Sequence, residues 1–361
     1  MKKRNLILIG LIVTAMLLLI GCAVNNNEVK TENKNNSASE ELKEIRVAVQ
    51  DYFISLSIGY MVENNIDEKF GLDIKLIEYP SGAEQIKDIE DDLYDVATIG
   101  TAYLEPLAQN QAVLIGELIK VTGGNGIYVR SGDPILDVKG FNPTYPLVFG
   151  NYETLVDRTV MLKKDTTQQY LGMKWLESIG VKKEKVHFIY ENRNYEKLFS
   201  RFMNNEGDVV ALSGPDSYRA ERNGLRKVAD TESLNMNIYE VLLATKKAHG
   251  EKRDELISFI ECLLYTNEIL EKDMSEKIDA GEKWYELHGQ DISHKDIKAE
   301  CKDKVFVTCE NYDIEKFGEY EKKYAEYMAA LGNISPLVLE NVDNNIDSKL
   351  FETALRKAGE R

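Results

Sequence analysis

The sequence is poor in the residues that build metal centres and catalytic triads. Of its 361 residues, only four are cysteines and four are histidines. No two cysteines form a Cys-x-x-Cys pair, and no histidine has a cysteine or acidic partner at metal-ligand spacing. No Ser-His-Asp arrangement or pair of catalytic carboxylates stands out. We therefore expect no bound metal, no cofactor and no enzymatic activity, and we interpret His288 and His294 as solvated surface residues.

An excess of positive charge is also missing. The chain has 45 Lys and Arg residues against 61 Asp and Glu residues, which gives a formal net charge of −16. Nucleic acids and anionic lipid headgroups attract proteins that carry an excess of positive charge. This balance speaks against a nucleic-acid partner and against electrostatic adhesion to a membrane.

The apolar run at the N-terminus is too short for a permanent membrane span. It covers residues 6–20, whereas a helix needs about 20 residues to cross the hydrocarbon layer. The run follows Lys2, Lys3 and Arg4, and residues 1–21 are therefore predicted to be a signal peptide. The phrase Leu-Ile-Gly-Cys that follows the run resembles the bacterial lipobox, which implies acylation of Cys22. An ordinary secretory signal that happens to end in cysteine is the alternative.

Residues 22–44 read as a flexible tether, because they are rich in Asn, Ser, Glu and Lys and contain too few apolar residues for a core. More than 300 residues remain from residue 45 onward. A chain of that length exceeds one compact core, so two lobes are expected.

Strand patterns alternate with helical patterns from residue 45 onward. Strands are predicted at 45–49, 72–79, 96–99, 113–115, 127–129, 159–162, 186–190, 209–212, 227–229 and 238–244. Ser55, Ser81 and Thr101 are each predicted to cap a helix, and Glu84 is predicted to complete a capping box with Ser81. Further helices are predicted at about 166–179, 195–203 and 315–331. The alternation predicts an α/β fold with mainly parallel sheets, in which ligands bind beyond the carboxyl ends of the strands.

Two smaller features leave alternatives open. The run Gly123-Gly124-Asn125-Gly126 lacks the Gly-Lys-Ser/Thr ending of a phosphate loop and precedes a strand, so we interpret it as a hinge or turn. Cys301 and Cys309 are close enough in sequence for a local disulfide in an oxidising compartment. Free thiols are the alternative for these two residues and for Cys262.

Several phrases of the sequence resemble solute-binding proteins of ABC importers, in the nitrate/sulfonate/taurine and thiamine-precursor family. The matching phrases are 45–49, 68–73, 79–82, 94–101 and 162–167, and the resemblance covers about residues 45–247, with a weak extension into the C-terminal third. It implies a type II periplasmic-binding-protein fold with two crossovers and an interlobe cleft. Lobe 1 would comprise residues 45–125 and 246–361, and lobe 2 residues 126–245. The implied protein is a monomer on the outer face of the cell membrane that delivers a small solute to a permease.

The resemblance also implies that the solute contacts loops that follow successive strands. The candidate ligand-binding residues on these loops are Asp51, Tyr52, Phe53, Ser55, Ser81, Gly82, Gly100, Thr101, Tyr103, Asp165, Thr166, Thr167, Asn192, Ser213 and Asp216. Each loop precedes a helix, and amides at helix N-termini suit an oxyanion such as a sulfonate or nitrate.

Carboxylates near the predicted cleft, at Asp51, Asp165, Glu191 and Asp216, weaken the oxyanion interpretation. The alternative solute is a pyrimidine or another vitamin-like heterocycle, which would stack on Tyr52, Phe53, Tyr79 or Tyr103. Two other functions remain open for the same fold. One is a sensory or adhesive lipoprotein, and the other is an enzyme related to pyrimidine-precursor synthases.

Overall fold

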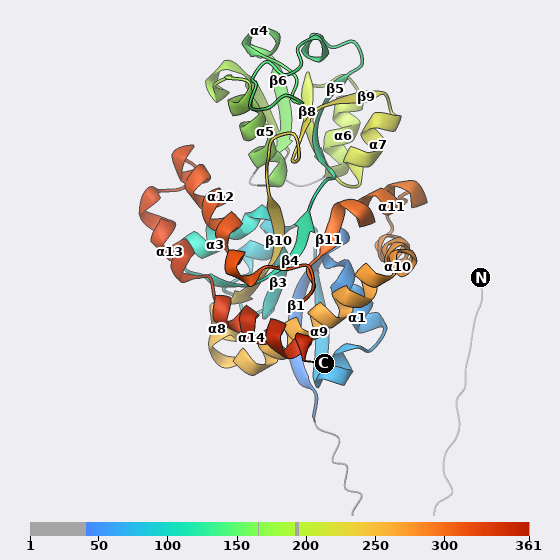
Figure 1. Ribbon diagram of the computed structural model, residues 1–361, viewed down its shortest axis with the longest axis vertical. Helices are drawn as coiled ribbons and strands as arrows, with labels where there is room; N and C mark the ends of the chain where they lie inside the picture. Colours follow the sequence, from blue (N-terminus) through green and yellow to red (C-terminus); the bar gives the residue numbers. More distant parts are fainter. Residues whose placement is uncertain (1–40, 165, 192–194, 361) are drawn as a thin grey trace, which may run out of the picture. The chain divides into compact units, whose positions relative to one another are not determined.

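Two β-sheets organise the chain (Figure 1). The structure is a computed structural model and describes residues 41–164, 166–191 and 195–360. The predicted signal peptide, Cys22 and nearly all of the tether lie outside the described residues, as do Asp165 and Asn192. We use the names lobe 1 and lobe 2 for the parts of the chain around the first and the second sheet.

The first sheet has six strands in the order β11-β4-β10-β3-β1-β2. Strand β1 pairs in parallel with β2 and β3, whereas β10 runs antiparallel between β3 and β4. The consecutive apolar residues of β3 are buried, as expected for a strand that is covered on both faces. The bounds are Lys43–Gln50 (β1), Leu72–Tyr79 (β2), Val96–Ile99 (β3), Ala112–Val121 (β4), Ile238–Thr245 (β10) and Lys304–Phe306 (β11).

The second sheet has five strands in the order β7-β6-β8-β5-β9. Strand β6 is parallel to β7 and β8, and β5 is antiparallel to β8 and β9. The bounds are Asn125–Arg130 (β5), Thr159–Lys163 (β6), His187–Glu191 (β7), Val209–Ser213 (β8) and Leu225–Asp230 (β9). The predicted α/β class with two lobes is confirmed. The sheets are mixed rather than mainly parallel, because β10 runs antiparallel to β3 and β4 in the first sheet and β5 runs antiparallel to β8 and β9 in the second.

Helices cover both sheets (Figure 1). The α-helices are Leu56–Glu63 (α1), Gly82–Lys87 (α2), Leu104–Ala108 (α3), Tyr152–Leu155 (α4), Thr167–Ser178 (α5), Tyr195–Met203 (α6), Asp216–Arg222 (α7), Lys246–Glu251 (α8), Arg253–Lys272 (α9), Met274–Leu287 (α10), His294–Asp303 (α11), Glu319–Ala330 (α12), Leu339–Asn344 (α13) and Ser348–Gly359 (α14). The 3-10 helices are Phe53–Ser55 (η1), Asp67–Phe70 (η2), Thr101–Tyr103 (η3), Pro134–Asp137 (η4), Lys183–Lys185 (η5), Ile314–Lys316 (η6) and Pro336–Val338 (η7). None of the helices in the described part of the chain has the length and apolar character that a membrane crossing requires.

The position of strand β10 does not agree with the predicted lobe boundary at residue 245. Its residues 238–245 were assigned to lobe 2, but β10 hydrogen-bonds to β3 and β4 of the first sheet. The reason is its apolar stretch, because Val241, Leu242 and Leu243 are each at most 1% exposed between these neighbours. The chain therefore enters the first sheet before residue 245.

The predicted side-chain caps on α1, α2 and η3 are wrong. Ser55 and Ser81 occupy N-cap positions without a side-chain capping bond, and Thr101 lies inside η3, whose N-cap is Gly100. The Ser55 hydroxyl instead accepts the Gln50 amide at 2.8 Å. The Glu84 carboxylate pairs with Lys87 on its own helix, which leaves no capping box at Ser81.

The three cysteines of the described residues, Cys262, Cys301 and Cys309, are free thiols. Of the two alternatives left open for Cys301 and Cys309, the structure contains free thiols and no disulfide between them.

The glycine run at 123–126 forms the first crossover between the sheets. It connects β4 to β5, and residues 231–237 connect β9 back to β10. Gly124 adopts a φ of +74°, and a Cβ atom there would lie 2.2 Å from the Tyr218 hydroxyl oxygen. That hydroxyl donates to Asp303 Oδ2 at 3.1 Å, and the Thr122 amide donates to the Asp303 carbonyl at 2.7 Å. The turn therefore requires glycine both for its backbone conformation and for its close packing.

We predict that Gly124→Ala lowers the free energy of unfolding by roughly 1–3 kcal/mol more than Gly132→Ala does. Gly132 is the matched control, because it has a φ of +82° but no heavy atom would lie within 4 Å of a Cβ atom added there. Both substitutions share the cost of a left-handed conformation, and only Gly124→Ala adds crowding against Tyr218. Urea unfolding of both variants measures the difference. An equal decrease in the free energy of unfolding in both variants would show that crowding against Tyr218 does not destabilise the protein.

Candidate functional site

A cavity of about 100 Å³ lies between the two lobes. We call it the interlobe cavity. It is lined by Gln50, Tyr52, Ile54, Ser81, Gly82, Ala83, Gly100, Thr101, Ala102, Val121, Asn125, Lys163, Thr166, Thr167, Gln168, Ser213, Gly214, Ile238, Glu240, Glu300 and Lys304. Most of these residues lie at or just beyond the carboxyl ends of β1, β2, β3, β6 and β8. Carboxyl ends of parallel strands are where α/β sheets bind ligands.

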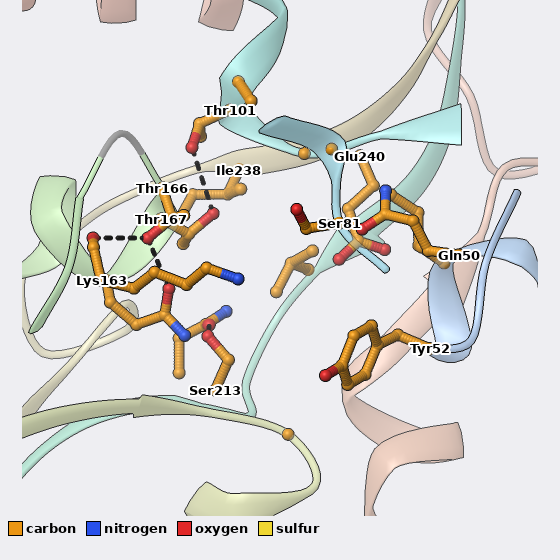
Figure 2. Close-up of a pocket in the computed structure, with 18 of the residues that line it drawn as sticks. Gln50, Tyr52, Ser81, Thr101, Lys163, Thr166, Thr167, Ser213, Ile238 and Glu240 are labelled. Atoms are coloured by element: carbon orange, nitrogen blue, oxygen red, sulfur yellow. Dashed lines mark hydrogen bonds between the residues drawn. The ribbon is translucent and has the colours of Figure 1, made fainter. Parts of the chain in front are cut away.

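Eight of the predicted ligand-binding residues line the interlobe cavity. They come from five different loops and are Tyr52, Ser81, Gly82, Gly100, Thr101, Thr166, Thr167 and Ser213. Figure 2 shows the side chains of six of them, Tyr52, Ser81, Thr101, Thr166, Thr167 and Ser213, around one space, with the Tyr52 and Ser81 hydroxyls facing the Lys163 side chain. The fold therefore brings these residues together, and their contact with a solute stays a prediction.

Five predicted residues do not line the interlobe cavity, and four of them have other contacts that explain it. Phe53 stacks on Phe306 with ring centroids 5.6 Å apart. Tyr103 packs edge-on against Tyr324 at 5.8 Å. The Ser55 hydroxyl is hydrogen-bonded to Thr98 at 2.7 Å, in addition to the Gln50 amide. Asp216 pairs with Arg219 at 2.5 Å and lines a smaller neighbouring pocket.

Asp51, the fifth of these residues, has its backbone held by the C-terminal part of the chain. Its carbonyl accepts from Gln290 Nε2 at 2.7 Å, and the next carbonyl, that of Tyr52, accepts from Trp284 Nε1 at 3.1 Å. Burial raises the pKa of the Asp51 carboxyl above its ordinary value, while nearby His288 lowers it. These contacts fix the loop that carries the Tyr52 side chain into the cavity.

His288 is not the solvated surface residue that we expected. Its side chain is only 7% exposed, its ring packs at a tilt against Trp284 with centroids 4.3 Å apart, and its Nδ1 is 2.7 Å from the Trp284 carbonyl oxygen. The cause is the turn after α10, which folds His288 back onto the helix. His294 is 65% exposed, as expected.

The sequence interpretation missed seven polar residues of the interlobe cavity, which are Gln50, Asn125, Lys163, Gln168, Glu240, Glu300 and Lys304. Gln50 and Lys163 are the last residues of β1 and β6, so the strand-end rule contained a signal for them. Glu240 lies inside β10, and Glu300 and Lys304 come from α11 and β11. No local pattern marks these three, because they reach the cavity through long-range packing.

Lys163 is the most deeply buried basic side chain of the cavity lining, at 2% exposure. Burial lowers the pKa of its ammonium group to about 7, against the opposing effect of Asp51, Glu191 and Glu84. In Figure 2 its amino group points toward the middle of the interlobe cavity. A bound anion would favour the protonated form of this group.

Among the described residues, two acidic side chains line the cavity, and both are balanced by their surroundings. Glu240 forms an ion pair with Lys304. Glu300 accepts a hydrogen bond from the Tyr285 hydroxyl at 2.6 Å, and burial raises its pKa to about 7. Neither carboxyl therefore presents a full, unopposed negative charge at neutral pH.

Neutral hydrogen-bonding groups complete the lining. The Thr101 and Thr167 hydroxyls are 3.4 Å apart and join lobe 1 to lobe 2. The Ser213 hydroxyl donates to Asn125 Oδ1 at 2.5 Å, and the Thr166 hydroxyl bonds to Gln168 Oε1 at 2.6 Å. Within the described ranges, no group of three or more His, Cys, Asp or Glu side chains could hold a metal ion.

Aromatic groups contribute little to the cavity. Of the four residues considered for stacking on a heterocycle, Tyr52 lines it, and Phe53, Tyr79 and Tyr103 do not. Tyr79 instead packs edge-on against Tyr94 at 5.8 Å. The site is therefore a small polar chamber with a buried cation and one aromatic wall.

The chain is similar to proteins of known or proposed function. No protein-family model matches it. A putative ABC transporter periplasmic binding protein from Brachyspira hyodysenteriae is 28% identical over 356 residues, which is 98% of this chain and 100% of that protein. A putative aliphatic sulfonates-binding protein from Bacillus subtilis is 30% identical over 151 residues, 39% of this chain and 40% of that protein.

The fold also matches a solved structure. The periplasmic aliphatic sulphonate binding protein of Escherichia coli superposes with a TM-score of 0.66 and 14% identity, over 86% of this chain and 99% of that one. The resemblance found in the sequence is thus confirmed: the chain is similar in sequence to proteins named as ABC-transporter and sulfonate binding proteins, and it has the periplasmic-binding-protein fold.

Proposed function

We propose that the protein captures a small oxyanion of the sulfonate class between its lobes and delivers it to an ABC-transporter permease outside the cytoplasm. The observation that carries this proposal is the burial of Lys163 at the carboxyl end of β6, with its amino group directed into the interlobe cavity. A cation that is removed from water interacts more strongly with an anion than an exposed one does.

The neighbouring groups support the same solute. Hydroxyl groups of Ser81, Thr101 and Thr167 line the cavity and can donate to anionic oxygens. Backbone amides at the start of α5, just after Thr166, add donors of the same kind. The relative from Bacillus subtilis is named for aliphatic sulfonates, which agrees with this chemistry. A heterocyclic solute has less support, because only Tyr52 offers an aromatic face.

Delivery depends on closure around the solute. The lobes are joined by the two crossovers, and Thr101 and Thr167 contact each other across the gap. A solute that bridges both sides of the cavity stabilises the closed form, which a permease can then distinguish from the empty one.

We predict that Lys163→Met weakens methanesulfonate binding by at least about tenfold, because it removes the buried positive charge while keeping a similar side-chain length. Lys164→Met is the matched control, since this adjacent residue is exposed and does not line the interlobe cavity. It should change the dissociation constant by less than about threefold. Isothermal titration calorimetry measures both, with nitrate and a pyrimidine as comparison ligands. If the pyrimidine binds and neither anion does, the solute is a heterocycle and the oxyanion proposal is wrong.

We predict that methanesulfonate affinity falls as the pH rises through 7. The pKa of Lys163 in the free protein is about 7, and the anion binds the protonated form, so binding above pH 7 takes up a proton. The dissociation constant should rise by up to about tenfold per pH unit.

Two variants identify the side chain that causes this pH dependence. Lys163→Arg keeps its charge at all relevant pH values and should flatten the profile. Any remaining slope belongs to Glu300, whose pKa of about 7 gives a negative charge over the same range, and it should vanish with Glu300→Gln added. Calorimetry at pH 8 in two buffers with different ionisation enthalpies measures how many protons the protein takes up when the anion binds. An unchanged slope in the double variant would exclude both groups as the source.

We further propose that Cys22 carries a lipid that anchors the protein. Metabolic labelling with a fatty acid should label the wild type and Cys309→Ser, but not Cys22→Ser. The proposal rests on the Leu-Ile-Gly-Cys phrase, which resembles the lipobox, and the net charge of −16 offers no electrostatic attraction to anionic lipid in its place. Absence of label in the wild-type protein, or a mature N-terminus at another residue, contradicts the proposal.

A further inference from the structure

Helix α12 connects lobe 1 to lobe 2 through its side chains (Figure 1). Its base belongs to lobe 1, because the amide of its N-cap, Gly318, donates to Glu117 Oε1 of β4 at 3.0 Å. In the first turn, Tyr320 stacks on Tyr239 of β10 with ring centroids 5.2 Å apart. The base of α12 is therefore fixed to β4 and β10, the two strands that lead to lobe 2 and back.

The second half of α12 contacts α5 of lobe 2. Tyr324 and Tyr327 are three residues apart and therefore lie on one face of α12. The Tyr170 ring packs against both, with its centroid 4.7 Å from that of Tyr324 and 5.2 Å from that of Tyr327. One turn further along α5, Lys174 Nζ lies over the Tyr327 ring, 3.9 Å from its centroid. An aromatic cluster and a cation–π contact thus join the two lobes.

The contact extends past the end of α12 and does not involve the interlobe cavity. Lys183 of η5 in lobe 2 donates to the carbonyl of Leu331, the C-cap of α12, at 3.1 Å. Neither these two residues nor the aromatic cluster and Lys174 line the interlobe cavity. The contact between α12 and lobe 2 can therefore form without a solute.

This contact lies on the same helical segments as the cavity wall. Thr167 begins α5 and lines the cavity, and Tyr170 follows three residues later. On the side of lobe 1, Thr101 and Tyr103 both belong to η3. The Thr101 and Thr167 hydroxyls are 3.4 Å apart. Tyr324 packs against Tyr103 at 5.8 Å as well as against Tyr170. Opening the cavity between Thr101 and Thr167 therefore also pulls Tyr170 away from α12.

We propose that α12 is a latch that favours the closed arrangement of the lobes whether or not a solute is bound. Tyr170 and Lys174 have to leave the face of α12 before the cavity opens. The latch and a solute both stabilise the closed form, so the latch reduces the free energy that the solute must supply for closure. This inference goes beyond the proposed function, because it does not depend on which solute binds.

The test is small-angle X-ray scattering from residues 22–361 in the absence of any solute. The triple variant Tyr170→Ala/Lys174→Ala/Lys183→Ala removes the side chains of lobe 2 that form the latch. It should shift the equilibrium toward the open form by roughly 100-fold, and its radius of gyration should exceed that of the wild type. Tyr170→Phe keeps the ring and should scatter like the wild type. Tyr265→Ala is the matched control, because this half-exposed ring packs against Phe70 at 5.7 Å within lobe 1.

A variant on the other side of the latch makes the test independent of lobe 2. Tyr327→Ala removes the ring on α12 that contacts both Tyr170 and Lys174, and it should increase the radius of gyration in the same direction. Thermal melting shows which variants are folded. Radii of gyration equal to that of the wild type in the folded latch variants would overturn the proposal. Because no solute is present, that result would leave the proposed function intact, and a failure of methanesulfonate to bind would leave the latch intact.

Discussion

The pairing of β10 with both β3 and β4 is the interaction on which the two-lobed arrangement depends. Strand β4 leads the chain out to the second sheet, and β10 returns it. The two strands are hydrogen-bonded neighbours, with Val121 opposite Ile238 at the end nearest lobe 2. Both crossovers therefore start from one place in the first sheet, and the lobes are joined by two adjacent strands of backbone. Such a connection permits rotation of the lobes while it keeps their facing edges aligned.

The same pairing builds part of the interlobe cavity. Ile238 and Glu240 lie on β10 and Val121 ends β4, so the crossover strands form one of its walls. Glu240 is in turn paired with Lys304 of β11, the strand next to β4. Movement of the lobes about the crossovers is thereby coupled to the position of charged groups that line the interlobe cavity.

Much of the fold could be predicted because its strands carry their own signal. The predicted ranges 72–79 and 96–99 match β2 and β3 to the residue. The alternation of apolar and polar residues at 72–79 and the short, mainly apolar run at 96–99 are both properties of the local sequence. The caps at Ser55 and Ser81 could not be predicted in the same way. Whether a serine hydroxyl bonds its own helix or a neighbouring strand depends on what packs beside it, as the contact between Ser55 and Thr98 shows.

In the candidate site, too, some residues could be predicted from the local sequence and others depend on tertiary packing. Residues that follow strand ends, such as Ser81, Thr101 and Thr167, could be found from the order of the elements together with the family resemblance. Phe53 and Tyr103 occur in the same loops, but their rings are used in packing against Phe306 and Tyr324. Sequence position alone does not tell which of two neighbouring side chains faces the cavity and which faces the core.

The C-terminal third, where the family resemblance is weak, also contributes to the candidate site. It supplies Glu300 and Lys304 to the cavity, and Trp284 and Gln290 fix the loop before Tyr52. It also supplies α12, whose base is fixed where the Gly318 amide donates to buried Glu117 of β4 at 3.0 Å.

Near the base of α12, burial raises the pKa of Glu321 well above its ordinary value, which favours the neutral form and lessens the charge repulsion with nearby Glu117. Helix α12 is thus attached to the strand that leads into the first crossover. In a strongly acidic protein, burial of a few groups, rather than the net charge, sets the local field around the interlobe cavity. The general fold provides the cleft between the lobes, and the C-terminal third adds Glu300 and Lys304 to its lining.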